Sequence, residues 1–149
     1  WMKYAPVGER GLAMGANVGH AAVDAARYCQ EANDATLLLL KIESHEGVKN
    51  SEAMLSNQWV DGVVFGPGDL AATMGYHGQW EHPEVVKAIQ SVVDIALAKG
   101  LATEPAVYPK TRQEYEAQRQ DGIQLFGRLR GSEYDLLREG AVQALSIYQ

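Results

Sequence analysis

Cysteine is almost absent from this chain, which has one, Cys29, in 149 residues. A single cysteine cannot form a disulfide within the chain, and it cannot supply a set of thiolate ligands for a structural zinc ion. The composition therefore fits a protein of the reducing cytoplasm. We expect Cys29 itself to lie on a helix, half buried against the core.

Positive charge is also scarce. Lys and Arg together number 13 against 19 Asp and Glu, and the formal net charge is -6. Proteins that bind nucleic acid need a surplus of basic side chains to neutralise phosphates, so a nucleic-acid partner is not expected. Long apolar runs are missing as well. No window approaches the roughly 18 apolar residues that span a bilayer, and no membrane partner is expected.

Common signatures of binding and targeting are missing too. The glycines from Gly8 to Gly19 form no phosphate loop, because no Gly-Lys-Ser/Thr follows them and no strand precedes them. The four histidines have no metal-ligand spacing, which favours surface or capping roles. The opening "WMKYAPVGERG" lacks the pattern of a signal peptide. It reads as the tail of a loop, and we expect the natural N-terminus to lie upstream.

The chain does contain an alternation of apolar strands and periodic helices. Apolar runs bounded by polar residues or glycine predict four strands, and capped periodic segments predict five helices. Pro105 fits poorly in the middle of the third strand. The expected strands cover residues 37–43, 60–66, 101–108 and 123–127; the expected helices cover residues 21–33, 44–57, 82–100, 111–122 and 132–148.

The short connections between these elements predict an α/β fold. Four strand-helix repeats of this kind form right-handed βαβ units and a parallel sheet. No linker or low-complexity tract interrupts the chain, so residues 1–149 are expected to form a single domain. The pattern leaves two architectures open, an open doubly wound sheet or part of a (β/α)₈ barrel, which usually needs about 200 residues or more.

Two acids follow neighbouring predicted strands. Glu43 ends the first, and Asp69 follows the second in "VDGVVFGPGDLAATMG" (residues 60–75). Ligands of parallel α/β folds bind beyond the carboxyl ends of the strands, so we expect the two carboxylates to converge. Mg²⁺ or Mn²⁺ between them would relieve their repulsion. Alternatively, each acid caps the helix that follows it, and spacing alone favours this second interpretation.

Two groups at this end of the sheet are candidates for binding an anionic substrate. Gly66, Pro67 and Gly68 break the second strand, and glycine lets a backbone turn leave its N–H groups facing a carboxylate. By itself the pattern also fits an ordinary turn, which is the default. Arg128 and Arg130 follow the last predicted strand, and either help bind an anion or belong to a solvated loop.

Three stretches carry a resemblance to a known family: "KYAPVGERG" (residues 3–11), "KIESHEGVKN" (residues 41–50) and "VDGVVFGPGDLAATMGYHGQWEHPEV" (residues 60–85). In this order and at this spacing, the chain resembles the HpcH/HpaI aldolase family, the metal-dependent class II pyruvate aldolases of the phosphoenolpyruvate-binding barrel superfamily. The likeness covers nearly the whole chain and is strongest over residues 36–98. It implies a (β/α)₈ TIM-barrel type of fold, of which this chain covers roughly the C-terminal half, strands five to eight.

The resemblance also implies an activity and a site. The activity is that of a lyase that cleaves 4-hydroxy-2-oxo acids to pyruvate and an aldehyde, or the reverse, through a pyruvate enolate stabilised by Mg²⁺, Mn²⁺ or Co²⁺. Glu43 and Asp69 would hold the metal, and the backbone of Gly66, Pro67 and Gly68 would receive the pyruvate carboxylate. Pyruvate and an aldehyde would be the small-molecule partners, and the chain would form a homo-oligomer.

The chain departs from the family pattern at three points. Lys41 stands where the family usually has a substrate-orienting Gln; it could contact an anionic substrate, but it would weaken metal binding unless the substrate's charge compensates. Glu104 and Pro105 replace Gly and small apolar residues of strand seven, which alters the substrate wall around Ala106. The family's general-base His and oxyanion-stabilising Arg belong to the first half of the barrel, match no residue here and are expected upstream.

These departures leave two alternatives to the aldolase. One is another enolate condensation on the same scaffold, such as a citrate-synthase-like reaction. The other is a non-catalytic half-barrel remnant that acts as a binding or oligomerisation module.

Overall fold

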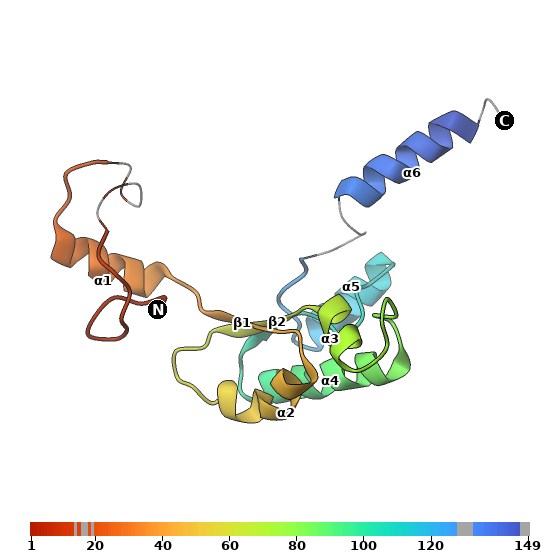
Figure 1. Cartoon of the computed structure of the whole chain (residues 1–149), viewed down its shortest axis with the longest axis horizontal. Helices are drawn as coiled ribbons and strands as arrows, with labels where there is room; N and C mark the ends of the chain where they lie inside the picture. The colour runs from red at the N-terminus through yellow and green to blue at the C-terminus, as the bar shows by residue number, and fades with distance from the viewer. Residues whose placement is uncertain (14, 16–17, 19, 128–132, 147–149) are drawn as a thin grey trace. The chain divides into compact units, whose positions relative to one another are not determined.

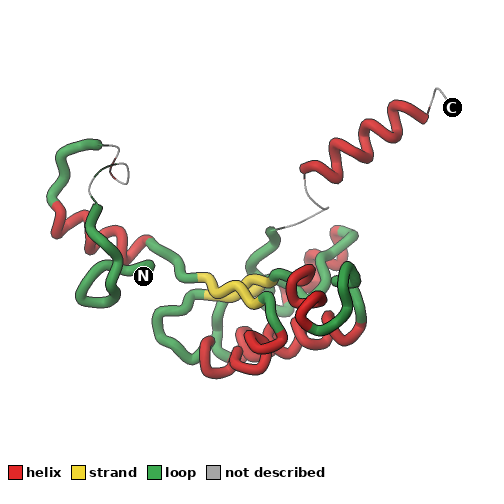
Figure 2. The backbone as a smooth tube through the Cα atoms, in the orientation of Figure 1, coloured by secondary structure: helices red, strands yellow, loops and turns green. Residues whose placement is uncertain are grey.

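The computed structural model describes residues 1–13, 15, 18, 20–127 and 133–146, and its elements are drawn in Figure 1 and as a tube in Figure 2. The chain divides into two compact units, Trp1–Leu38 and Leu39–Gln149. No helix among the described residues is long and apolar enough to cross a membrane.

The first unit is built on helix α1 (Ala25–Ala35). Asp24 caps it, because its side chain accepts two backbone N–H groups of the first turn. The helix therefore begins at Ala25 rather than at residue 21, where the sequence pattern placed its start. The opening loop is tied back to the end of α1, since Lys3 Nζ donates to the carbonyl oxygen of Asn33. Cys29 lies on α1 and is half-buried, as expected.

The second unit contains a parallel three-stranded sheet. Its strands are β1 (Leu39–Ile42), β2 (Gly62–Phe65) and β3 (Ala102–Thr103), hydrogen-bonded in the order β1-β2-β3. The register pairs Ile42 with Phe65 at the carboxyl ends of β1 and β2. The predicted α/β class with a parallel sheet is therefore confirmed.

Helices connect and follow the strands. One helix crosses from β1 to β2, two cross from β2 to β3, and two follow β3 along the chain. They are α2 (His45–Met54), α3 (Pro67–Thr73), α4 (Pro83–Ala98), α5 (Arg112–Gln120) and α6 (Glu133–Leu145).

Polar caps set the starts of the helices that sequence patterning located. Proline at the first position, with its fixed φ, suits the start of α4, and His82 before it accepts the N–H of Glu84. This confirms a capping role for one of the four histidines. Thr111 and Glu114 form a capping box at the start of α5, where a helix from residue 111 is expected.

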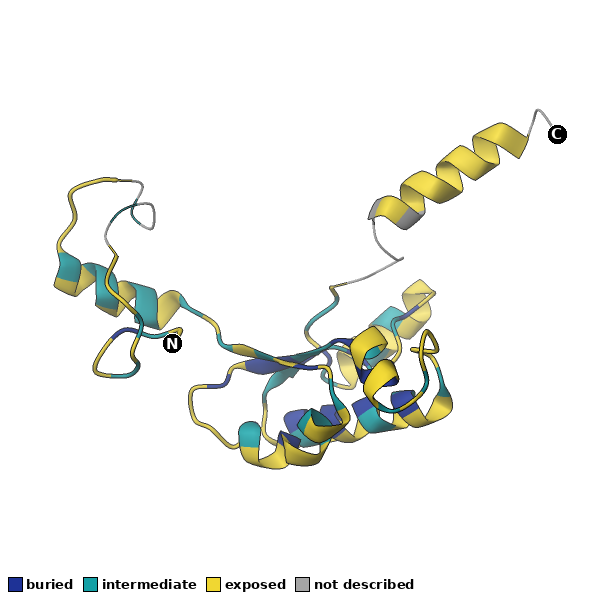
Figure 3. Ribbon diagram, in the orientation of Figure 1, coloured by how far each residue is buried: buried dark blue, intermediate teal, exposed yellow. Residues whose placement is uncertain are grey.

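The core lies where α4 packs against α3 and β2 (Figure 3). The apolar stripe of α4 supplies much of it, as its spacing predicts. The buried residues of this cluster are Leu70, Ala71, Val85, Ile89, Val93 and Ile123. Because α3 contributes Leu70 and Ala71 to this cluster, packing against the core holds the segment after β2 in place.

The structure corrects two further expectations about the elements. The predicted fourth strand is wrong, since residues 123–127 form no strand, although the N–H of Leu125 donates to the carbonyl oxygen of Thr103. The reason is the shortness of β3, which ends before Pro105 and leaves little edge to pair with. Helix α3 was not expected, because the Gly-Pro-Gly pattern predicted a turn.

Three residues with predicted roles lie outside the described residues. They are the basic pair Arg128 and Arg130, and Ser132, at which the last expected helix begins.

Candidate metal and substrate site

Glu43 and Gly66 lie side by side just beyond the carboxyl ends of β1 and β2. Each is the next residue after the register pair of Ile42 and Phe65. The N–H of Gly66 donates to the carbonyl oxygen of Ile42 at 3.0 Å, which continues the pairing one residue beyond β2. The sheet therefore brings the first predicted acid against the predicted Gly-Pro-Gly segment.

Gly66 leaves space that the side chain of Glu43 occupies. A Cβ at position 66 would lie 2.7 Å from the Cβ of Glu43, 2.9 Å from its Oε2 and 3.2 Å from the Cε of Lys41. The φ of Gly66 is -108°, which any residue can adopt, so space rather than backbone angle requires glycine here. Any larger residue at position 66 would therefore clash with Glu43, and we call this close approach of Glu43 to the bare Cα of Gly66 the glycine cradle.

Lys41 forms an ion pair with Glu43. The two residues are separated by one position on an extended strand and share a face of the sheet. The Nζ of Lys41 lies 2.8 Å from Oε2 of Glu43, and the two side chains are 56% and 46% exposed. An ion pair this exposed contributes only about 0–1 kcal/mol, so Glu43 can exchange its partner at small cost.

Asp69 lies in the first turn of α3, and the predicted turn is the start of this helix. The N–H of Leu70 donates to the carbonyl oxygen of Gly66, which closes the first helical turn. The N–H of Gly66 is already used by β1, and Pro67 has none. Only Gly68 and Asp69 in this turn therefore carry N–H groups without a partner inside the helix.

The capping interpretation does not hold for Glu43. Ser44 caps α2, since its Oγ accepts the N–H of Gly47 at 3.0 Å, and the acid in the first turn of α2 is Glu46. Asp69, by contrast, does sit where a helix N-terminus favours negative charge. A role at a helix N-terminus therefore fits the position of Asp69 but not that of Glu43.

One hydrogen bond fixes the two acid-bearing segments to each other. The N–H of His45, at the start of α2, donates to Oγ1 of Thr73, at the end of α3, at 3.0 Å. Sequence reasoning missed this contact, because the two residues are far apart in the chain and no periodic pattern links them. The start of α2 follows Glu43 directly, so this bond ties it to the helix that carries Asp69.

The donor chemistry of the site fits a hard divalent cation. Within the part of the chain that the structure describes, no group of three or more His, Cys, Asp and Glu side chains could hold a metal ion. Two carboxylates nevertheless supply the oxygen donors that Mg²⁺ prefers, and this ion usually keeps water and substrate oxygens as its other ligands. Glu43 and Asp69 are the two carboxylates predicted for this role, and Gly66 leaves room for the side chain of Glu43 at the start of the segment that carries Asp69.

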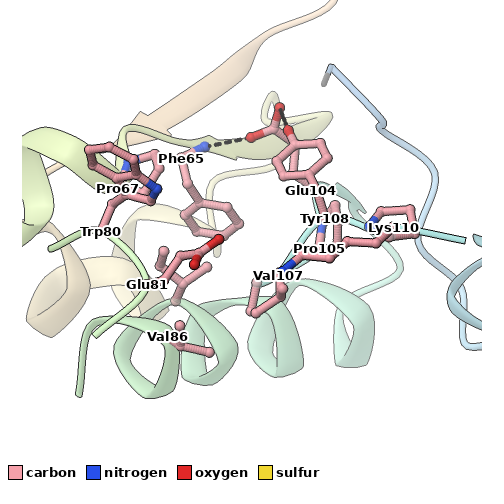
Figure 4. Close-up of a pocket in the computed structure, with 13 residues that line it drawn as sticks. Phe65, Pro67, Trp80, Glu81, Val86, Glu104, Pro105, Val107, Tyr108 and Lys110 are labelled. Atoms are coloured by element: carbon pink, nitrogen blue, oxygen red, sulfur yellow. Dashed lines mark hydrogen bonds between the residues drawn. The ribbon is translucent and has the colours of Figure 1, made fainter. Parts of the chain in front are cut away.

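A cavity of about 500 Å³ opens at the same end of the sheet but on its helix side (Figure 4). Pro67 and Ala106 line it, together with aromatic side chains that include Phe65 and Trp80. The other predicted metal and substrate residues that the structure describes do not line this cavity; they are Lys41, Glu43, Gly66, Gly68 and Asp69. Phe65 packs against the buried core cluster, and strand alternation places Lys41 on the opposite face of the sheet. The cavity and the Glu43 carboxylate therefore lie on different faces.

Glu104 is held by two donors of the chain itself. Its Oε2 accepts the N–H of Phe65 at 2.9 Å, and its Oε1 accepts the hydroxyl of Tyr108 at 2.6 Å (Figure 4). Sequence reasoning treated Glu104 only as a departure from a family pattern. The acid and Phe65 are 39 positions apart, so no local spacing could have paired them.

Together these features define a class of protein. It is a parallel α/β protein with an acid and a glycine cradle beyond neighbouring strands, at the sheet end where such folds bind their ligands. The profile of the HpcH/HpaI aldolase/citrate lyase family matches residues 1–127. The chain belongs to this family, and the predicted membership is confirmed.

Relatives of the chain are aldolases by name. The 2-keto-3-deoxy-L-rhamnonate aldolase of Salmonella paratyphi B is 38% identical over 117 residues, which cover 72% of this chain and 42% of that protein. The 4-hydroxy-2-oxo-heptane-1,7-dioate aldolase of Escherichia coli is 42% identical over 97 residues, which cover 61% and 35%. The chain therefore spans less than half the length of these curated relatives.

A solved structure shows a similar fold. The HpcH/HpaI aldolase from Desulfitobacterium hafniense matches with a TM-score of 0.78 and 27% identity. The match covers 98% of this chain and 55% of that one.

Proposed function

We propose that this chain is part of a divalent-metal-dependent aldolase that cleaves 4-hydroxy-2-oxo acids to pyruvate and an aldehyde, or joins the two. Family membership supports this function, as do two relatives that are named as aldolases of 2-oxo acids. The observation in this chain that carries the proposal is the junction of β1 and β2. There the carboxylate of Glu43 lies against the bare Cα of Gly66, one turn before Asp69.

The proposed architecture is part of a (β/α)₈ barrel. The three described strands are parallel, and β1 and β3 form the two edges of their sheet. In the proposed barrel, further strands pair with these edges and contribute the general-base His and the oxyanion-stabilising Arg of the family. Open sheet edges also favour association, so we include assembly as a homo-oligomer in the proposal.

Glu43 and Asp69 are the proposed ligands of Mg²⁺, Mn²⁺ or Co²⁺. Such a cation supplies Lewis-acid stabilisation of the enolate formed when the carbon–carbon bond breaks. Lys41 balances the charge of Glu43 in the free protein, as its ion pair with Oε2 indicates, and contacts the anionic oxo acid in the complex. Its replacement of a neutral Gln is compatible with the site because the substrate brings negative charge.

The Gly66–Gly68 segment is the proposed place of the substrate carboxylate. We narrow the proposed donors to the N–H groups of Gly68 and Asp69, because in the first turn of α3 only these two have no partner inside the helix. Pro67 and Ala106 are the proposed apolar residues beside it, since Pro67 belongs to the same turn and Ala106 follows β3 at the same end of the sheet.

An aldol assay on the complete protein tests the function. Pyruvate and a panel of aldehydes are supplied with Mg²⁺, Mn²⁺ or Co²⁺, and turnover is compared for the unaltered protein, Glu43→Gln and Asp69→Asn. Both variants should lose about 100-fold or more in kcat/KM, the scale of losing one electrostatic group at a developing oxyanion. Unchanged turnover in either variant would sink the assignment.

Glu46→Gln is the matched control. Glu46 is an acid in the first turn of α2, three positions from Glu43, and it is not one of the proposed metal ligands. Its amide variant should keep full activity. The control shows whether loss of activity follows removal of negative charge in general or removal of the proposed ligand.

A further inference from the structure

Glu104 uses both oxygens of its carboxylate within the chain. One accepts the backbone N–H of Phe65, at the end of β2, and the other accepts the hydroxyl of Tyr108, in the segment after β3. Figure 4 shows these two bonds on opposite sides of the carboxylate. Glu104 is therefore engaged as a double acceptor between two segments.

The carboxylate stands in for a backbone carbonyl of the sheet. Hydrogen bonds between parallel strands are evenly spaced along the ladder. Glu104 continues the ladder between β2 and β3 by donating its N–H to the carbonyl oxygen of Val63. In a regular ladder, the N–H of Phe65 would next donate to the backbone carbonyl of Glu104. The chain instead leaves the sheet at Pro105, and the side chain of Glu104 accepts this N–H. A partly buried N–H thereby keeps a partner that the early end of β3 would have removed.

The two bonds connect the segments that carry the proposed metal and substrate groups. Phe65 immediately precedes Gly66, the start of the turn that carries Asp69, and Tyr108 lies two positions beyond Ala106. We infer that Glu104 is a positioning residue, which holds the end of β2 and the Ala106 wall at a fixed separation. This inference rests on the proposed function, because it assigns Glu104 a role in that same site.

Two acceptors are required for this role. A glutamine side chain has only one acceptor oxygen, and its amide would turn a donor toward one of the two donors. Gly127 closes the site from a third segment, since a Cβ there would lie 2.9 Å from Oε1 of Glu104 and 3.6 Å from the Tyr108 hydroxyl. Three variants therefore act differently: Glu104→Ala removes both bonds, Tyr108→Phe removes one, and Gly127→Ala pushes on the same oxygen without removing a group.

The test measures Mn²⁺ affinity by calorimetry and the KM for pyruvate on the full-length protein. Tyr108→Phe and Gly127→Ala should raise the KM for pyruvate about tenfold and leave Mn²⁺ affinity within twofold, because they release only the Ala106 side. Glu104→Ala should raise the KM and also weaken Mn²⁺ binding, because it frees the end of β2 as well. Glu104→Gln keeps one acceptor oxygen, so it should show only one of the two changes, either the raised KM or the weaker Mn²⁺ binding.

Val93→Ala separates positioning from general loss of stability. Val93 is buried in the core and does not line the cavity, so this variant lowers the melting temperature without touching the carboxylate. If it shifts both constants as Glu104→Ala does, or if Tyr108→Phe and Gly127→Ala leave the KM unchanged, the inference is overturned. If the unaltered protein neither binds Mn²⁺ nor turns over pyruvate, the proposed function fails and the inference falls with it.

Discussion

Two carboxylates follow strands of the same sheet, and they are held in opposite ways. Glu43, after β1, meets one flexible ammonium group, and both partners are about half exposed. Glu104, after β3, meets a backbone N–H and a tyrosine hydroxyl, and each of its oxygens is used. An exposed ion pair exchanges partners at little cost, whereas a part-buried acceptor of two hydrogen bonds does not. The comparison separates an acid that can change its partner at little cost from one that joins two segments of the chain.

The largest expected effect comes from the glycine that faces Glu43. Gly66→Ala would place a Cβ 2.7 Å from the Cβ of Glu43 and displace its carboxylate. Mn²⁺ affinity measured by calorimetry should fall by about 100-fold or more, since sub-ångström placement governs such sites. In Gly68→Ala, two positions later, the added Cβ meets nothing within 4 Å, so affinity should stay near that of the unaltered protein. Equal losses in the two variants would contradict the cradle at Gly66.

The next largest effect is the difference between the two carboxylates in their contribution to the free energy of unfolding. Glu104→Ala leaves the part-buried N–H of Phe65 without its acceptor, which should lower the free energy of unfolding by about 1–3 kcal/mol. Glu43→Ala removes only an exposed ion pair, and its effect should be about 0–1 kcal/mol. Urea denaturation of the metal-free protein measures both values. A larger loss in Glu43→Ala than in Glu104→Ala would reverse the assignment of the two acids.

The smallest expected effect concerns Lys41. Lys41→Gln removes the cation that pairs with Glu43, so Mn²⁺ should bind roughly fivefold more tightly, since two charges about 4 Å apart in water interact by about 1 kcal/mol. Lys41→Arg keeps the charge and should bind Mn²⁺ as the unaltered protein does. Calorimetry without substrate measures the difference. Weaker binding by Lys41→Gln would show that Lys41 supports the metal site rather than competing with the metal.

Local pattern was enough to predict the edge at which Glu43 lies. An apolar run ending in an acid, followed by a second run ending in glycine, predicts two buried parallel strands whose carboxyl ends meet. The structure has these strands as β1 and β2. Strand alternation also puts Lys41 and Glu43 on one face, so their ion pair follows from positions two apart. The helix that begins at Pro83 was equally accessible, because its apolar stripe and its proline are local features.

The environment of Glu104 was not accessible from local pattern. Its partner Phe65 is 39 positions away and contributes a backbone group, which has no signature in the sequence. The fourth strand failed for a related reason, because pairing at residues 123–127 depends on the length of β3, and Pro105 cuts β3 short. Helix α3 was missed because Gly-Pro-Gly fits both a turn and a helix start, and burial of Leu70 and Ala71 in the core favours the helix.

Calorimetric titration of the complete protein with Mn²⁺, with and without Glu43→Gln, tests the central claim most directly. A metal site at the junction of β1 and β2 predicts one saturable binding event in the unaltered protein. Glu43→Gln should abolish this event, and Glu46→Gln should leave it unchanged. The absence of saturable binding in the unaltered protein, as expected of a non-catalytic remnant, or equal binding by Glu43→Gln, would contradict the claim.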